Sequence, residues 1–216
     1  MPIVFFTHNE RFSEKIREQG FESRVANIQD FIPDESRRTY YVSPANSLCF
    51  MDGGIDYALS RIVFPGIEPK VKRAVRELNI QNKIGRYYLP IGSSIILEDT
   101  GKFLVVSPTM LLPQDVSGTR NAYYATMATL YNVLVNRGEN LDEVDILMTS
   151  FCCGYGKMDE DESIQQIMEG IRDYPHYDPR IIDENTIVNE PTLLNQPKLY
   201  QNTEWFSIHP EEIIRC

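Results

Sequence analysis

Residues 41–56 read Tyr41-Val42-Ser43-Pro44-Ala45-Asn46-Ser47-Leu48-Cys49-Phe50-Met51-Asp52-Gly53-Gly54-Ile55-Asp56. A β-branched and aromatic run at 39–42 stops at a proline, and a glycine pair precedes helical spacing. This order predicts a strand, a loop and a helix N-terminus, an arrangement that binds phosphate or pyrophosphate. Gly53 and Gly54 alone would make a structural turn. An amide at Asn46 and an acid at Asp56, on either side of the turn, indicate a site.

The rest of the chain alternates between strand and helix patterns. Short β-branched and aromatic runs predict strands at 3–6, 24–28, 39–42, 94–97, 103–106 and 145–148. Apolar residues at helical spacing predict helices at 10–19, 55–62, 71–78, 127–134 and 164–171. Gly20 and Gly138 are predicted to end the first and fourth of these helices, and Asp161 or Ser163 to begin the last. The alternation predicts an α/β fold with three layers.

Length and composition fit one globular domain with a tail. The chain has 216 residues, of which 42% are hydrophobic and 24% charged, which is ordinary for a soluble domain. From about residue 174 onward, prolines punctuate polar residues without periodicity. We therefore predict a domain of residues 1–174 and an extended tail of residues 175–216, packed on the domain through Trp205, Phe206 and Ile208. A small partner surface on the tail is the alternative.

The charge balance narrows the choice of partners. Lys and Arg number 21 against 31 Asp and Glu, so the net charge is −10. This argues against a broad basic surface for nucleic acid, while backbone N–H groups at a helix start still hold an anionic ligand. The first residues are expected to form a strand rather than a signal peptide, and no apolar run is long enough to span a membrane. Four cysteines without metal spacing, Cys49, Cys152, Cys153 and Cys216, favour free thiols in a reducing cytoplasm.

The opening loop resembles a known family. Residues 42–46 read V-S-P-A-N and residues 52–56 read D-G-G-I-D, which is similar to the V-N-A-A-N and G-G-G-V-D signature of the macro domain, an ADP-ribose-binding fold. Residues 107–110 and 119–123 resemble the A-P-T-M and T-x-N-A-Y segments of a macro-like branch found in bacteria and phages. Residues 154–158 resemble the G-V-G-G-M loop of that branch. Three motifs in order over residues 24–174 make the match specific, although each alone is weak.

The resemblance implies a fold and a ligand. It implies a three-layer α/β/α macro-like fold with a mixed central sheet of about six strands, and ADP-ribose as the ligand, with no cofactor and no metal. Asn46 would orient the distal ribose, and Asp56 would position the water that attacks its C1″ atom, so these two are the expected catalytic residues. The other expected ligand-binding residues are Asn27, Ser43, Ala45, Gly53, Gly54, Ile55, Thr109, Thr119, Cys153, Gly154, Tyr155, Gly156 and Lys157.

Three departures from the family pattern bear on chemistry. Ser43 stands where most macro domains have asparagine, and Ser60 stands where several hydrolytic ones have histidine. Asn27 falls where an aspartate normally reads the adenine amine, and its neutral carbonyl accepts a weaker hydrogen bond. Arg120, beside Thr119, fits the pocket rim and the solvent equally well. Cysteine catalysis at Cys152 or Cys153 is a minor alternative, since it needs a base or an electropositive setting.

Three functions fit the sequence. The favoured one is binding of ADP-ribose or a derivative, with hydrolysis of an ADP-ribosyl bond at the distal ribose. The second is a non-catalytic reader of ADP-ribosylated protein or nucleic acid, favoured by the serines at positions 43 and 60. The third is an ADP-ribose-1″-phosphate phosphatase. The expected partner is therefore the small molecule ADP-ribose or an ADP-ribosylated macromolecule.

Overall fold

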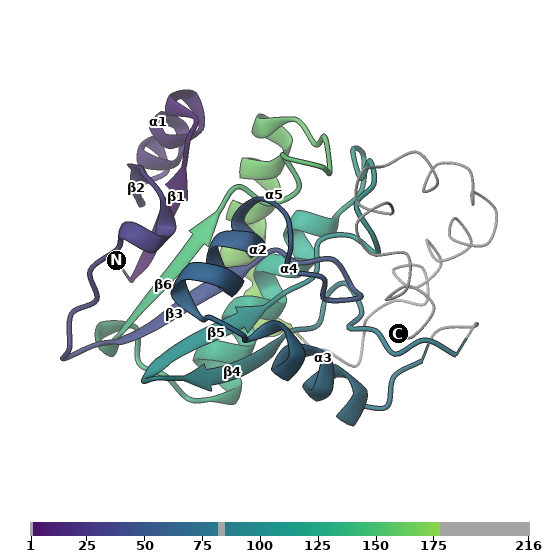
Figure 1. Cartoon of the computed structure of the whole chain (residues 1–216). Helices are drawn as coiled ribbons and strands as arrows, with labels where there is room; N and C mark the ends of the chain where they lie inside the picture. The colour runs from purple at the N-terminus through teal and green to yellow at the C-terminus, as the bar shows by residue number, and fades with distance from the viewer. Residues whose placement is uncertain (1, 82–84, 178–216) are drawn as a thin grey trace.

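The structure is a computed structural model that describes residues 2–81 and 85–177. In this part of the chain, six strands form one sheet: β1 (Ile3–Thr7), β2 (Glu22–Val25), β3 (Arg38–Ser43), β4 (Ile95–Asp99), β5 (Lys102–Val106) and β6 (Val144–Thr149). Five α-helices accompany them: α1 (Glu10–Glu18), α2 (Gly54–Ala58), α3 (Glu68–Glu77), α4 (Asn121–Leu130) and α5 (Glu160–Asp173). Figure 1 shows the strands and helices in chain order.

The sheet is mixed, with the strand order β2-β1-β6-β3-β5-β4. Among the described strands, β4 alone runs antiparallel to its neighbour, because only a two-residue turn joins it to β5. β3 pairs with β6 on one side and β5 on the other, and both pairs are parallel. The carboxyl ends of β1, β2, β3, β5 and β6 therefore lie along one edge of the sheet.

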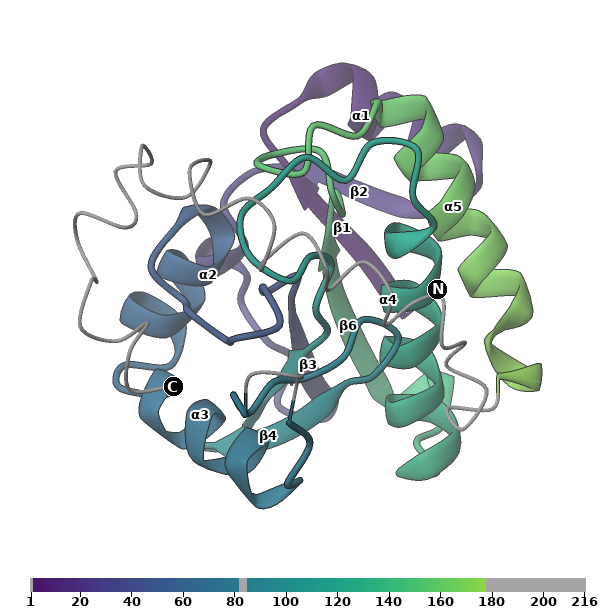
Figure 2. The same cartoon turned by 90° about the vertical axis from the view of Figure 1, so that its right-hand side faces the viewer.

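Helices cover both faces of the sheet, giving three layers (Figure 2). On one face α1, α4 and α5 bury a core that includes Phe5, Tyr40 and Ile146. On the other face α2 and α3 bury a core that includes Tyr41 and Leu147. Alternate residues of β3 thus point to opposite cores, as the two-residue period of a strand requires. The predicted three-layer α/β fold is confirmed.

Most predicted elements are present, but two boundaries were wrong. β2 ends at Val25, and Ile28 instead begins a 3-10 turn, because its side chain leaves the sheet to pack in the core under α2. α5 is capped by Asp159, whose side chain accepts from the N–H groups of Asp161 and Glu162, rather than by Asp161 or Ser163. The predicted ends of α1 at Gly20 and of the α4 segment at Gly138 are confirmed, since both glycines have positive φ.

Two helices continue into π-helical turns. α2 is followed by η2 (Leu59–Val63), and α4 by η3 (Tyr131–Asn136). The single predicted helices at 55–62 and 127–134 therefore each correspond to two segments. Simple α-helical spacing does not predict the π turns, and it misplaces the apolar face at the end of the first one, where Val63 is buried and Ile62 is 55% exposed.

A buried carboxylate, that of Glu139, binds side chains of β3 near the edge of the sheet where the parallel strands begin. Glu139 accepts a hydrogen bond from the hydroxyl of buried Tyr40, and its Oε2 lies 2.8 Å from Arg38 Nη2. We expect Glu139→Ala to destabilise the fold by about 2–3 kcal/mol, because Tyr40 loses its partner inside the protein. Glu143 is the matched control: it contacts the same arginine at 3.1 Å but is exposed, so Glu143→Ala should cost less than about 0.5 kcal/mol. Urea unfolding of both variants tests this, and equal losses would contradict it.

The predicted tail lies almost wholly outside the described residues. Only residues 175–177 are described, where Tyr177 donates a hydrogen bond to the carbonyl of Gly92 and its ring packs against Tyr131. The predicted docking of Trp205, Phe206 and Ile208 falls outside the described part. Among the described helices, none combines the length and apolarity needed to cross a membrane.

Candidate functional site

Between β3 and β6, the helix that follows each strand packs on a different face of the sheet. The helix after β6, α5, packs on one face, and the helix after β3, α2, packs on the other. In open α/β sheets, ligands bind beyond the carboxyl ends of the strands at such a switch point. Residues 44–53 and 150–158, which follow β3 and β6, therefore border the candidate site.

Backbone hydrogen bonds join the site loops to one another. The loop after β5 is tied to the loop after β3, since Thr109 N donates to Ala45 O at 3.0 Å and Ser47 N donates to Met110 O at 2.8 Å. The loop after β5 is also tied to the loop after β6, because Val116 N donates to Gly156 O at 2.9 Å. The loops after β3, β5 and β6 therefore lie together.

The two glycine turns meet at Gly53 and Tyr155. A Cβ atom placed on Gly53 would lie 3.6 Å from Cε2 of the Tyr155 ring, which is itself 69% exposed. Gly54 has φ +52°, a conformation that glycine adopts readily, and begins α2. The start of α2 and the turn after β6 thus face each other across the switch point.

Ser43 and Asp56 form a hydrogen-bonded pair at this point. Ser43 ends β3 and is fully buried, and its Oγ donates to Asp56 Oδ1 at 2.6 Å. Asp56 lies in the first turn of α2 and is partly exposed as a residue, but its carboxyl group is surrounded by protein. The hydroxyl of Ser43, which was expected to bind ligand, therefore donates its hydrogen bond to Asp56.

Burial raises the pKa of Asp56 to about 7. The hydrogen bond from Ser43 opposes this rise, and the negative charges of Asp52 and Glu68 add to it. The dipole of α2 favours the ionised form of a carboxyl group at the start of the helix. That effect is worth about 0.3–1 kcal/mol at a helix start. A pKa of about 7 in place of about 3.9 corresponds to about 4 kcal/mol, so burial outweighs the dipole. At neutral pH both protonation states are populated, as suits a general acid or base.

Asn46 supports the loop in which it lies. Its Nδ2 donates to Phe50 O at 3.0 Å, and its Oδ1 accepts from Leu48 N at 3.1 Å and from Phe50 N at 3.4 Å. The residue is 7% exposed. The amide therefore shapes the turn that leads to Gly53, and one Nδ2 hydrogen is left for a ligand.

Ser60 and the cysteine pair have no free reactive group. Ser60 is buried, and its hydroxyl donates to Met51 O at 2.6 Å, so it ties the helix to the loop before Gly53. Burial raises the pKa of Cys152 to about 12 and also raises the pKa of Cys153. Both thiols are thus held protonated at neutral pH, which argues against a cysteine nucleophile.

Thr149 was missed by the sequence reasoning. The register that pairs Tyr41 with Leu147 places Ser43 beside Thr149, and both point toward α2. The buried Oγ1 of Thr149 has no hydrogen-bond partner among the described residues. Thr39 at the other end of β3 is orphaned in the same way, so this property alone does not mark a site. The sequence signal that could have pointed to Thr149 is a threonine at the carboxyl end of an apolar strand.

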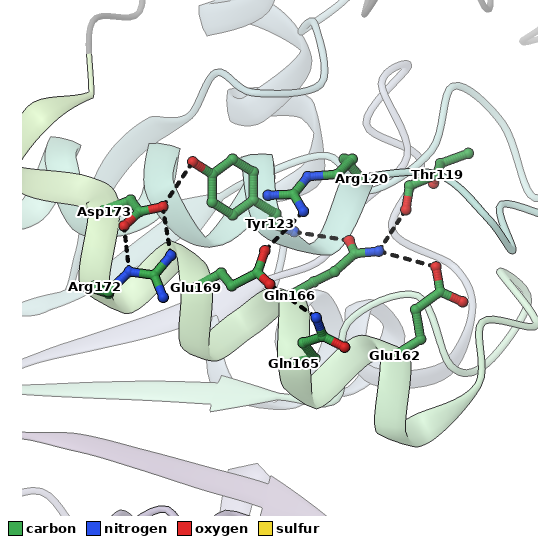
Figure 3. Close-up of polar contacts among 9 residues, drawn as sticks. All are labelled: Thr119, Arg120, Tyr123, Glu162, Gln165, Gln166, Glu169, Arg172 and Asp173. Atoms are coloured by element: carbon green, nitrogen blue, oxygen red, sulfur yellow. Dashed lines mark hydrogen bonds and ion pairs between the residues drawn. The ribbon is translucent and has the colours of Figure 1, made fainter.

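The rim residues from α4 are held by α5 (Figure 3). Gln166 Nε2 donates to Thr119 O at 2.6 Å, and its Oε1 accepts from Tyr123 N at 3.3 Å, so it caps α4 from a neighbouring helix. Arg120 lies 2.8 Å from Glu169 and stacks on Tyr123. Arg120 therefore braces α4 against α5. The hydroxyl of Thr119 donates a hydrogen bond to Val116 O at 2.7 Å.

The remaining predicted residues are distributed around the same edge. Ala45 and Thr109 are buried in the paired loops, Ile55 packs against the α2 core, and Cys153 and Gly154 lie in the turn after β6. Lys157 is exposed, with its Nζ 4.0 Å from Asp115 Oδ2.

Asn27 follows β2 at the same edge. It is exposed, and its Nδ2 donates to Asp30 Oδ2 at 2.9 Å. This bond leaves the Asn27 carbonyl oxygen as an acceptor and places a carboxylate next to it. Within residues 2–81 and 85–177, no group of three or more His, Cys, Asp or Glu side chains could hold a metal ion.

Comparisons with known proteins concern the fold. No protein-family model and no curated protein matches the chain. Among solved structures, a glycine-to-valine mutant of the Oceanobacillus iheyensis macrodomain with ADPR matches at 17% identity and a TM-score of 0.51, covering 68% of this chain and 73% of that one. The same macrodomain with MES bound matches at 17% identity and a TM-score of 0.52, covering 71% and 76%. This chain therefore has the fold of the macrodomains.

Proposed function

We propose that this protein binds ADP-ribose, or an ADP-ribose derivative, at the switch point between β3 and β6. The observation that carries the proposal is the meeting of two glycine turns, at Gly53 and Tyr155, where Gly53 begins the turn that carries Asp56. Turns of this kind present backbone N–H groups to a diphosphate without side-chain charge, which suits a chain of net charge −10. A solved macrodomain of the same fold is described with ADPR.

In this proposal the diphosphate lies between the 53–54 and 154–156 turns, and the distal ribose lies near Asp56. Asn46 orients that ribose with its remaining amide hydrogen. The base lies toward Asn27, whose carbonyl oxygen accepts from an exocyclic amine. The carboxylate of Asp56 accepts a proton from water as the water oxygen bonds to C1″. The bond from C1″ to the acceptor group breaks, and the acceptor group leaves with the bonding electron pair and takes a proton from solvent. A pKa of about 7 lets Asp56 accept that proton at neutral pH.

Binding is tested by calorimetry with free ADP-ribose, with AMP and ribose 5-phosphate as partial ligands. We expect saturable heat with ADP-ribose and much weaker heat with either fragment, because neither fragment spans the site from Asn27 to Asp56. The absence of heat and of any thermal shift at millimolar ADP-ribose would overturn the proposal.

A non-catalytic reader is the second candidate. Ser60 stands where several hydrolytic macro domains have histidine, and its buried hydroxyl donates to Met51 O. Incubation with an ADP-ribosylated protein separates the two. Turnover at saturating substrate that falls about 10²–10⁴-fold in Asp56→Ala, while ADP-ribose binding is weakened but still measurable, supports the enzyme. Binding without turnover in the unmodified protein supports the reader, and free phosphate released from ADP-ribose-1″-phosphate would indicate the phosphatase instead.

A further inference from the structure

One hydrogen bond connects the end of β3 to the first turn of α2. Ser43 Oγ lies 2.6 Å from Asp56 Oδ1, and Ser43 is 0% exposed. A buried serine of this kind cannot rotate toward solvent to find another partner, so the bond is fixed by the packing of the sheet. The carboxyl group is consequently held through Oδ1, and Oδ2 is the oxygen left for other partners.

The charged groups that act on Asp56 are acidic. Asp52, in the preceding loop, and Glu68, at the start of α3, both disfavour its ionised form. The charge of Glu68 is partly balanced, since its carboxylate lies 3.1 Å from Lys72 Nζ and 3.5 Å from Arg61 Nη2. Among the side chains of the described residues that shift the pKa of Asp56, Asp52 and Glu68 raise it, and the hydroxyl of Ser43 lowers it.

We propose that Ser43 is the positioning residue of Asp56: its hydroxyl holds Oδ1, directs Oδ2 toward the bound ligand, and keeps the carboxyl group able to accept a hydrogen bond at neutral pH. Ser43 itself contacts no ligand. This role is more than structural, because loss of the Ser43 hydroxyl changes the charge of Asp56 as well as the packing around it.

The consequence for ligand binding rests on the proposed function. An ionised Asp56 accepts a hydrogen bond from a ribose hydroxyl or from water, whereas a protonated one has lost most of that capacity. Loss of the Ser43 hydroxyl raises the pKa of Asp56 further, because a bond to the ionised form is removed. Ligand affinity near neutral pH should fall and should recover as the pH rises.

The direct test is a pH titration of the Asp56 carboxyl carbon by NMR, with ¹³C-labelled aspartate and Asp56→Asn to assign the signal. We expect Ser43→Ala to move the midpoint upward by about one unit. Ser43→Thr, which keeps the hydroxyl, should restore it. The matched control is Ser107→Ala. Ser107 is equally buried at the end of β5, but its hydroxyl pairs with Thr129 on α4 at 2.7 Å. That variant should titrate like the unmodified protein.

The outcomes separate this inference from the proposed function. An unchanged or lowered midpoint in Ser43→Ala, or an equal shift in Ser107→Ala, overturns the inference whether or not ADP-ribose binds. An upward shift specific to position 43 supports it even if calorimetry shows no binding, which would instead refute the proposed function. Where ADP-ribose binds, we expect Ser43→Ala to lose about fivefold in affinity at pH 7 and to regain it by about pH 9. A loss that is the same at both pH values would indicate a packing defect and would contradict the role.

Discussion

Replacing Gly156 by alanine is expected to destabilise the protein by about 3 kcal/mol and to abolish ligand binding. A Cβ atom at this position would clash with the carbonyl oxygen of Cys152 and lie 2.8 Å from Val116 Cγ2. The carbonyl cannot retreat, because it accepts a hydrogen bond from Met158 N at 3.1 Å. The turn after β6 would have to open, and the bond from Val116 N to Gly156 O would be strained with it.

Gly154 provides the control within the same turn. A Cβ atom there would meet no atom within 4 Å, and the residue is exposed. Gly154→Ala should therefore retain the thermal midpoint of the unmodified protein, whereas Gly156→Ala should lower it by about 10 °C. Differential scanning calorimetry distinguishes the two. If both alanine variants melted alike, the turn would be more adaptable than its packing indicates.

The contrast between these two glycines shows a difference that could not be predicted from the sequence. The G-x-G pattern predicted both glycines as ligand contacts, because spacing alone treats them alike. In the folded chain Gly156 is buried between two loops that come from different strands, while Gly154 faces solvent. The tightest contact at Gly156 is with the carbonyl of Cys152 in the same turn, and Val116, about forty residues earlier, packs against it as well. The G-x-G pattern reveals neither contact, so only the assembled structure separates a packing glycine from an exposed one.

Asp56 shows the same limit for electrostatics. Its place in the first turn of α2 was predictable from the glycine pair and the apolar spacing that follows. Its charge state was not, because the pKa depends on burial and on Glu68, twelve residues further along. The strands and the three layers were more predictable, since alternating apolar residues reveal which faces are buried without any knowledge of partners. The side-chain partners of Ser43, Asn46 and Gln166 depend on how those layers meet.

Asp56→Asn is expected to make the protein more stable at alkaline pH. The proposed function also predicts that this variant has no turnover. In the folded protein the pKa of Asp56 is about 7, against about 3.9 in an unfolded chain. Between these values the folded state binds more protons than the unfolded state, so the free energy of unfolding falls as the pH rises. The carboxyl group thus reduces stability by up to about 4 kcal/mol above pH 7 and by nothing below about pH 4. Asparagine keeps the shape and an acceptor for Ser43 but carries no charge.

Urea unfolding of both proteins at pH 4 and pH 8 measures this difference directly. The two should be similar at pH 4, and Asp56→Asn should be the more stable at pH 8. Asp34→Asn supplies a control of opposite sign: hydrogen bonds from Ser36 lower the pKa of Asp34, so removing that charge should lose stability at pH 8. An Asp56→Asn variant less stable than the unmodified protein at pH 8 would mean that the buried charge is well compensated. Packing alone would favour a neutral side chain where the two glycine turns meet. An acid kept there at a cost in stability is therefore what we expect of a carboxyl group with a function.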